Sequence, residues 1–192
     1  VSIFFDVPEA DLVSVDHAAG CEALGRHLGE LGHRRAAFIG PQFDLAERRL
    51  AGACRGITAA GGGIPDELVR MAPYAANPRD TRQFVDELVA VRERVPFSAI
   101  MVYNDYMASF AIRRLEEHGL RVPADISVTG FDGAVSTELH APNLTTAAIP
   151  LEELGAEAVR LLTWRLANRE AGRRKVILET ALQAGETTAP VA

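Results

Sequence analysis

Polar side chains stand directly after apolar runs of this chain, at positions where they can contact a small molecule. Asn104 follows the run 99–103, and Asp132 follows the run 126–130. An amide both donates and accepts hydrogen bonds and a carboxylate accepts several, so the pair suits a ligand that carries hydroxyl groups. Each residue also has a structural interpretation, because Asn often caps a helix and an Asp before a Gly often belongs to a turn. At this point both interpretations stay open.

Arg49 is a third candidate, one turn into the helix predicted after the loop 41–44. The planar fork of a guanidinium makes two parallel hydrogen bonds to vicinal hydroxyls or to a carboxylate. An arginine on a helix face is more commonly solvated or ion-paired at the surface. The sequence alone does not choose between the two.

Motifs for catalysis or metal binding are missing from the sequence. His17, His27 and His33 lack the paired spacing of metal ligands, and no His-Glu-x-x-His sequence occurs. There is no Gly-x-Ser-x-Gly motif, and the glycines 61–63 follow a predicted helix instead of opening one, as a phosphate loop would. We therefore expect no catalytic residue, no metal and no cofactor, and we expect that the protein is not an enzyme.

Short apolar runs alternate with longer stretches of helical periodicity, and these elements must position the candidate residues. The predicted strands are 1–5, 36–40, 69–72, 99–103, 126–130, 145–149 and 176–182. The predicted helices are 16–31, 45–60, 77–91, 104–118 and 151–167. Apolar strands that alternate with helices indicate an α/β fold, with parallel sheets covered by helices on both faces. Ligands of such folds lie beyond the carboxyl ends of the strands, where the candidate residues stand.

Composition and charge narrow the class of protein. The chain has 192 residues, 48% of them hydrophobic, which suits a globular domain with a core, and its longest apolar runs are too short to span a bilayer. The net charge is −6, and acidic residues are interspersed among the basic clusters, so we expect no nucleic-acid binding by this sequence itself. No signal peptide is recognisable, and the first residue is not Met, so we expect a cytoplasmic protein represented by a fragment. Cys21 and Cys54 are expected to be free thiols on helices.

Several segments in the same order resemble the LacI/GalR family of transcriptional regulators. They are 13–20 (VSVDHAAG), 31–40 (LGHRRAAFIG), 48–52 (RRLAG), 104–108 (NDYMA), 119–132 (GLRVPADISVTGFD) and 144–146 (LTT). The stretch 119–132 is the most specific, and the segments together span most of the chain. A single Gly or Asp would mean little, but this ordered series is typical of the family.

The resemblance implies the periplasmic-binding-protein-like I fold, in which two α/β lobes joined by three crossing strands hold a ligand in the cleft between them. On that template, 16–147 and 181–192 form a complete C-terminal lobe. The segments 1–15 and 148–180 supply part of the N-terminal lobe. A helix-turn-helix head for DNA is expected in the family and is absent from this sequence.

The resemblance also implies ligand contacts. The family's Arg-Leu-x-Gly pattern favours Arg49 over Arg48, and the pattern around Asn104 makes Asn104 a ligand contact and Asp105 the helix cap. The Gly-Phe-Asp pattern makes Asp132 a contact, although the family often has a second Asp where this chain has Gly133.

Two further contacts are implied by position. Tyr74 stands where relatives place an aromatic ring that stacks on the ligand, and it is equally well a loop anchor. Asp6 is the contact expected from the other lobe. These carboxylates, the amide, the arginine and the aromatic ring would form a site for a neutral, hydroxyl-rich molecule.

The function that the resemblance implies is the sensing of a small effector, a sugar or alternatively a nucleobase. The effector would control operator binding through the head, and the regulator would act as a homodimer without contacting a membrane. The alternative is an exported sugar-binding protein of a transport system, which shares the fold. A signal peptide would identify the second, and a helix-turn-helix the first.

Overall fold

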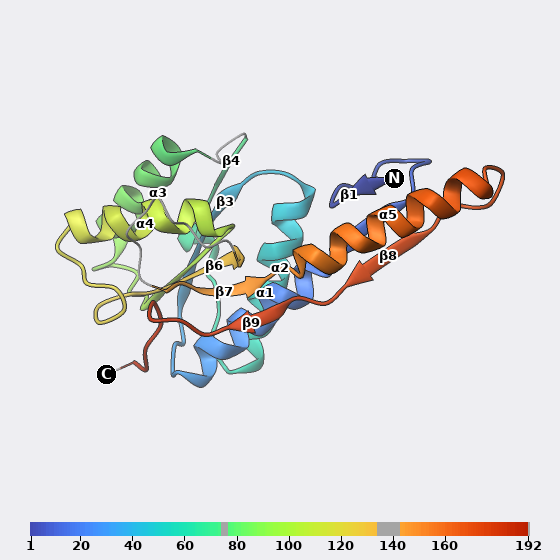
Figure 1. Cartoon of the computed structure of the whole chain (residues 1–192). Helices are drawn as coiled ribbons and strands as arrows, with labels where there is room; N and C mark the ends of the chain where they lie inside the picture. Colours follow the sequence, from blue (N-terminus) through green and yellow to red (C-terminus); the bar gives the residue numbers. More distant parts are fainter. Residues whose placement is uncertain (74–76, 134–142, 192) are drawn as a thin grey trace.

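The computed structural model describes residues 1–73, 77–133 and 143–191, and they form two β-sheets with helices packed around them (Figure 1). The larger sheet has the strand order β4-β3-β5-β6-β7-β9, and all its neighbours are parallel except β9, which runs antiparallel to β7. Its strands are β3 (Ala36–Pro41), β4 (Val69–Ala72), β5 (Ala99–Val102), β6 (Ser127–Asp132), β7 (Thr145–Ala148) and β9 (Ala181–Gln183).

The smaller sheet has three parallel strands in the order β1-β2-β8. They are β1 (Ser2–Ile3), β2 (Leu12–Val15) and β8 (Lys175–Leu178). Helix α5 (Leu151–Ala167) lies along this sheet and extends away from the larger one (Figure 1). The parallel sheets and the alternation of strands and helices confirm the predicted α/β fold class.

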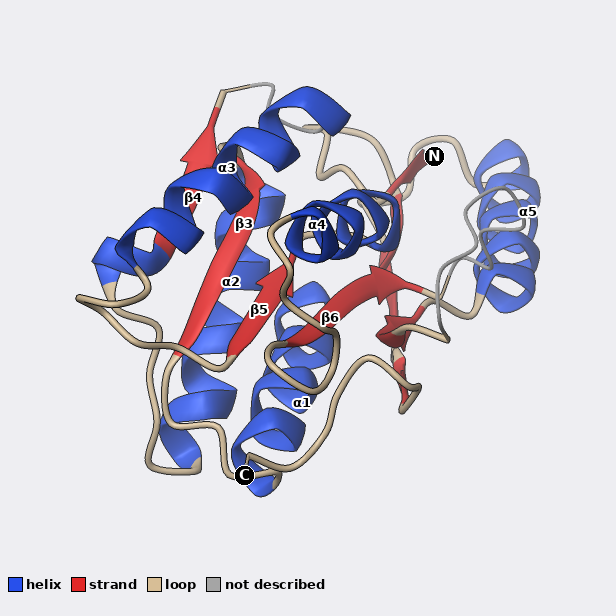
Figure 2. Ribbon diagram, turned by 90° about the vertical axis from the view of Figure 1, so that its left-hand side faces the viewer, coloured by secondary structure: helices blue, strands red, loops and turns tan. Residues whose placement is uncertain are grey.

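Helices cover both faces of the larger sheet, as predicted (Figure 2). One face packs against α1 (His17–Glu30) and α2 (Asp44–Ala59), and the other against α3 (Pro78–Val91) and α4 (Asp105–Glu117). A 3-10 turn, η1 (Asp66–Leu68), precedes β4. Neighbouring residues of β3 illustrate the two cores, because buried Phe38 belongs to the cluster with α1 and α2 and buried Ile39 to the cluster with α3 and α4.

Residues of types that commonly begin or end helices stand at several of the predicted helix boundaries. Oδ1 of Asp16 accepts a hydrogen bond from the Ala19 amide at 2.9 Å and caps α1. Oδ1 of Asn77 accepts one from the Asp80 amide at 3.0 Å and caps α3. Gly119 ends α4 with φ +78°, a left-handed conformation that glycine adopts without steric cost.

Two strand predictions were wrong. The strand expected at 1–5 is only Ser2–Ile3, and the main strand of that region is Leu12–Val15, which pairs with both neighbours in the small sheet. The single strand expected at 176–182 is two strands. The chain pairs with β2 up to Leu178 and with β7 from Ala181. Apolar periodicity does not reveal that a strand changes its partner, so the sequence could not show this break.

The chain passes between the two sheets three times. The connections are β2 to α1, β7 to α5, and β8 to β9, which involve residues 15–17, 148–151 and 178–181. The carboxyl ends of β2 and β8 therefore lie close to the large-sheet elements that begin beyond them. The candidate site lies in this region.

Helices α1 and α2 pack with their backbones in close contact, and glycines make the approach possible. A Cβ atom on Gly52 would lie 2.1 Å from the carbonyl oxygen of Ala18, and one on Gly56 would lie 2.1 Å from that of Glu22. These obstacles are backbone atoms, which cannot rotate away. Since α2 carries Arg49, the glycines also determine how deeply that residue enters the molecule.

We expect Gly52→Ala to lower the free energy of unfolding by about 2 kcal/mol or more, because the added methyl forces the helices apart. Gly155→Ala is the matched control, since Gly155 lies on α5 with no atom within 4 Å of an added Cβ. This control should be neutral or stabilise by up to about 1 kcal/mol through higher helix propensity. Urea denaturation followed by circular dichroism measures both, and equal effects of the two substitutions would contradict the close contact.

Candidate functional site

A cavity of about 310 Å³ opens beyond the carboxyl ends of β5 and β6. Arg49, Asn104 and Asp132, the three polar residues singled out from the sequence, all line it. Its other walls are the side chains Phe4, Phe5, His17, Leu45, Tyr103, Ile149 and Leu151. The expected convergence of these three residues on one crevice is therefore observed.

Arg49 lies at the centre of the site and is only 3% exposed. Its Nη1 donates to the carbonyl oxygen of Tyr103, and its Nη2 lies 3.3 Å from Oδ1 of Asp132. Its Nε and Nη2 approach Nδ1 of His17 at 3.3 and 3.1 Å. Arg48 instead is largely exposed and pairs with Asp44 at 2.9 Å, so of the two arginines it is Arg49 that lines this cavity.

Two aromatic rings enclose the guanidinium of Arg49. Its Cζ lies 3.7 Å from the centroid of the Phe131 ring and 4.3 Å from that of Tyr103. A cation over an aromatic face is stabilised by the ring quadrupole, most strongly where water is excluded. The rings therefore help to compensate for the burial of the charge.

Asp132 combines partial burial with an unusual backbone. Its φ is +118°, which is strained for a residue with a Cβ, and Gly133 follows with φ +73°. Burial raises the pKa of Asp132 above its ordinary value, while the charge and hydrogen bond of Arg49 oppose that rise. The side chain is 34% exposed, and only Oδ1 contacts Arg49, so Oδ2 has no partner among the described residues. A carboxylate oxygen in this position can accept a hydrogen bond.

His17 also lines the cavity, and it was not singled out from the sequence as a site residue. It is buried at the start of α1, and its ring stacks on Phe131 with centroids 5.5 Å apart. Burial, and next the charge of Arg49, lower its pKa to about 4, so the ring is neutral near pH 7. The only sequence signal was its place after the capping Asp16, and that does not show where the ring points.

The prediction that Asp105 caps the helix was wrong, because Asn104 is the cap. Asn104 is the N-cap of α4, with Oδ1 accepting from the Met107 amide at 2.9 Å. Asp105 is buried and accepts a hydrogen bond from Oγ1 of Thr146 at 2.7 Å. A Cβ on Gly130 would lie 2.3 Å from Oδ1 of Asp105, so this carboxylate also explains the glycine. Asn104 still lines the cavity, and its Nδ2 has no partner among the described residues.

Of the two remaining predicted residues, Asp6 does not line this cavity. Asp6 binds Arg173 and, at 2.6 Å, Nζ of Lys175, and these hydrogen bonds lower its pKa to about 2. It lines a neighbouring cavity, and its two cationic partners already occupy its oxygens. Tyr74 lies outside the described residues.

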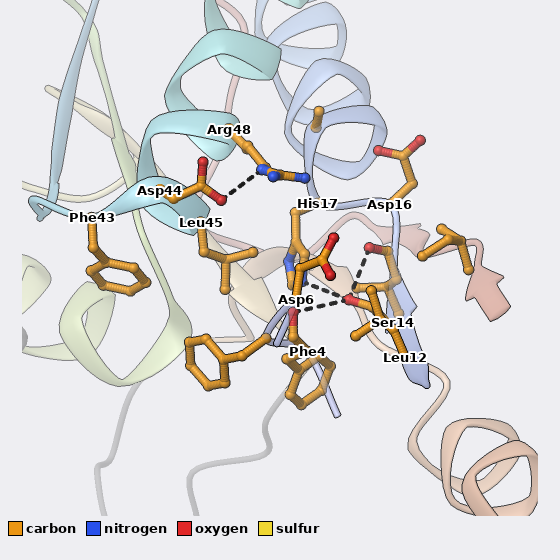
Figure 3. Close-up of a pocket in the computed structure, with 14 residues that line it drawn as sticks. Phe4, Asp6, Leu12, Ser14, Asp16, His17, Phe43, Asp44, Leu45 and Arg48 are labelled. Carbon is orange, nitrogen blue, oxygen red and sulfur yellow. Dashed lines mark hydrogen bonds and ion pairs between the residues drawn. The ribbon is translucent and has the colours of Figure 1, made fainter. Parts of the chain in front are cut away.

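The neighbouring cavity has a volume of about 480 Å³ and lies on the small-sheet side (Figure 3). It shares Phe4, Phe5, His17 and Leu45 with the first cavity, so His17 lies between the two. The charged side chains on its wall are Asp6, Asp16, Asp44 and Arg48. Asp44 is paired with Arg48, as the dashed line in Figure 3 shows.

The described residues contain no group of His, Cys, Asp or Glu side chains arranged to hold a metal ion. Within the same part of the chain, no helix combines the length and the apolarity needed to cross a membrane. Cys21 and Cys54 are free, as predicted, and both lie on helices. The cavity thus offers paired donors and acceptors together with aromatic walls, which is the chemistry of a binding site for a polar molecule.

The fold and this site define a binding domain of the kind found in periplasmic binding proteins. Residues 26–188 match the periplasmic binding protein-like domain family. The chain belongs to that family.

The relatives within the family are regulators of transcription by name. The chain is 30% identical over 183 residues to the HTH-type transcriptional regulator DegA of Bacillus subtilis, covering 94% of this chain and 53% of that protein. It is 32% identical over 187 residues to the HTH-type transcriptional regulator CelR of Thermobifida fusca, covering 94% and 53%. The chain therefore spans about half the length of these relatives.

Solved structures agree with these matches. A LacI family transcriptional regulator from Enterococcus faecium with bound ribose superposes with a TM-score of 0.83 at 27% identity, covering 98% of this chain and 69% of that one. The complex of the regulator CelR with cellobiose gives a TM-score of 0.82 at 29% identity, covering 95% and 56%. The predicted resemblance to LacI-type regulators is thus confirmed.

We expect His17 to make stability depend on pH. The unfolded chain takes up the proton near pH 6.5 and the folded chain only near pH 4. Because the unfolded state binds more protons between these values, the free energy of unfolding falls as the pH drops from 6.5 to 4, with a share from His17 of up to about 3 kcal/mol.

Replacement by a group that does not titrate isolates this share. His17→Asn should lose less stability than the unmodified chain between pH 7 and pH 4.5 in urea denaturation. His33→Asn is the control, because His33 is also buried but far from the cavity, and it should keep the share of His17. Identical pH dependence in His17→Asn and the unmodified chain would contradict the neutral, buried imidazole.

Proposed function

We propose that this chain is the effector-sensing part of a DNA-binding transcriptional regulator and that it binds a small neutral sugar in the cavity around Arg49. The convergence of Arg49, Asn104 and Asp132 on one cavity carries the proposal, because donors and acceptors enclosed by aromatic walls suit vicinal hydroxyl groups. Two regulators with similar folds have ribose or cellobiose bound, which supports a sugar over a nucleobase.

The charges around the cavity favour an uncharged ligand. Arg49 is opposed by Asp132, and in the adjoining cavity Asp44 is opposed by Arg48. Asp6 is opposed by Arg173 and Lys175. An anionic ligand would have to displace one of these carboxylates from its cation, which costs the desolvation of both partners.

The division into lobes that we propose follows the two sheets. Residues 16–147 and 181–192 form one lobe around the larger sheet, and 1–15 and 148–180 belong to a second lobe around the smaller one. The apolar side chains of α5 support further packing on that second lobe, because four of them are 48–64% exposed: Leu151, Val159, Leu162 and Leu166.

The regulation that we propose acts through the relative position of the two lobes. A ligand that contacts both lobes favours the closed arrangement and so changes the spacing of DNA-binding heads across a dimer. It acts only to the extent that it binds one arrangement more tightly than the other. Operator DNA would be contacted by a helix-turn-helix head outside this sequence, consistent with the HTH-type relatives and with the net charge of −6.

The same proposal assigns the protein to the cytoplasm, where a regulator meets DNA, and gives it no catalytic activity. Arg49 and Asp132 are paired with each other, and the part of the chain that the structure describes presents no nucleophile with an adjacent base in the cavity. The regulatory role of the relatives favours this function over an exported sugar-binding protein.

The test is binding of neutral sugars with and without Arg49. In a thermal-shift and calorimetric screen that includes ribose and cellobiose, we expect at least one neutral sugar to bind and its phosphorylated form to bind more weakly. Arg49→Ala should weaken binding of the best sugar by about tenfold to a hundredfold, as expected for the loss of a charged hydrogen-bond donor.

Arg55→Ala is the matched control for this experiment. Arg55 lies on the same helix as Arg49, but its side chain is exposed and pairs with Glu22 at 2.9 Å. Its loss should leave the sugar affinity unchanged. If Arg49→Ala bound the sugar as well as Arg55→Ala does, the ligand site would lie elsewhere.

The dimer belongs to the proposal as well, and α4 is the element that supports it. Tyr106 is 51% exposed there and forms an edge-to-face pair with Phe110 at 5.0 Å. Exposed aromatic residues are enriched at the centres of protein interfaces. The described part of the chain thus presents an aromatic surface on a helix that also begins at the ligand cavity.

We expect sedimentation velocity to show self-association that Tyr106→Glu weakens at least tenfold, because a charge would be buried among aromatic rings. Thr58→Glu, an exposed position on α2, should have no effect on association. A monomer at all concentrations, or equal effects of the two substitutions, would contradict a dimer through α4.

A further inference from the structure

The ring of His17 connects Arg49 with strand β2 of the small sheet. Nε and Nη2 of Arg49 lie 3.3 and 3.1 Å from Nδ1 of His17. A guanidinium carries only donors, so Nδ1 must be the acceptor and the proton of the neutral ring must lie on Nε2. Nε2 in turn lies 3.4 Å from Oγ of Ser14, in the middle of β2. Nδ1 therefore contacts Arg49 at the cavity, and Nε2 contacts Ser14 of the small sheet.

The orientation of this ring is determined from both sides. Phe131 of β6 stacks on it at an interplanar angle of 30°, and Phe4 meets it edge-on at 5.9 Å. Figure 3 shows the side chain between Leu45 of α2 and Ser14, with a dashed line to the serine hydroxyl. Packed in this way, the ring keeps its Nδ1 directed at Arg49.

No other described group accepts from Nε of Arg49. The carbonyl oxygen of Tyr103 accepts from Nη1, and Asp132 accepts from Nη2. Without His17, the Nε–H group would be a buried donor with no partner, and such a group costs the full penalty of its desolvation. The guanidinium would then turn to find another acceptor, and its pairing with Asp132 would change.

We propose that His17 is a positioning residue, which holds the guanidinium of Arg49 in its pairing with Asp132 and ties this orientation to strand β2. The ligand role of Arg49 itself rests on the proposed function. Since β2 belongs to the small sheet, a displacement of that sheet relative to α2 changes the support of the ligand-facing arginine. His17 is thus a direct physical link between the two sheets at the cavity.

The charged groups around His17 keep it in the neutral form that this role needs. Arg49 and Arg48 approach it from α2, and both disfavour the imidazolium. Asp16, at the start of its own helix, favours the charged form, and Asp132 of β6 reaches it only through Arg49. Protonation at Nδ1 would place two donors against each other, so the link should break in acid.

The experiment follows the Nε–H signal of Arg49 by nitrogen-edited NMR of the full chain without any ligand, with Arg49→Lys identifying the signal. His17→Asn keeps an acceptor close to the position of Nδ1, whereas His17→Phe keeps the ring packing but has no acceptor. We expect slow solvent exchange of Nε–H in the unmodified chain and in His17→Asn, and exchange at least tenfold faster in His17→Phe. His33→Asn, at another buried histidine, should leave the signal unchanged.

The chemical shift of this signal should also change as the pH falls through about 4 in the unmodified chain, and stay constant there in His17→Asn. Slow exchange in His17→Phe, or loss of the signal in both His17 variants, would overturn the proposal. If His17→Phe does not fold, the pH profiles of the other two proteins decide the matter.

These outcomes can be separated from failure of the proposed function. A chain that shows the expected NMR behaviour but binds no sugar would contradict only the sugar site. A chain that binds sugar, but whose Arg49 signal does not respond to the His17 substitutions, would contradict only the positioning role.

Discussion

The burial of one positive charge organises the centre of this molecule. A guanidinium removed from water must find hydrogen-bond acceptors and a counter-charge, or the fold loses several kcal/mol. Arg49 finds them on three different elements: the carbonyl oxygen of Tyr103 after β5, the imidazole of His17 on α1, and the carboxylate of Asp132 at the end of β6. The rings of Tyr103 and Phe131 enclose the remaining surface of the cation. The position of Arg49 on α2 thus requires that β5 and β6 end, and α1 begins, close to one another.

That point is also where the chain passes between its two sheets. The carboxyl ends of parallel strands leave their last residues free of the ladder, and a cavity forms where both sheets end towards each other. Phe4 and Phe5 reach it from the small-sheet side, and Asn104 and Asp132 from the large sheet. A ligand in the proposed site would contact residues on both sides, which is the physical condition for binding to change the relative position of two lobes.

Two polar groups at the cavity make no hydrogen bond to the described residues, and they indicate what kind of molecule the cavity can bind. Oδ2 of Asp132 and Nδ2 of Asn104 have no partners among the described residues, while the charge of Arg49 is already balanced. The free groups are one acceptor and one donor, a pattern that a hydroxylated neutral molecule satisfies. The strained φ of Asp132 occurs at the last residue of β6, where the carboxylate contacts the arginine.

Local signals in the sequence determined the α/β class, most helix boundaries and the convergence of Arg49, Asn104 and Asp132, because helix caps, apolar periodicity and strand ends depend on near neighbours in the chain. The order of motifs in 104–132 also indicated the family. Tertiary structure alone decided the rest. It split 176–182 between two sheets, made Asn104 and not Asp105 the cap, paired Asp6 with Arg173 and Lys175, and turned the ring of His17 towards Arg49. Each of these outcomes depends on which groups far apart in the chain compete for the same hydrogen bond or strand edge, and a linear pattern carries no information about that competition.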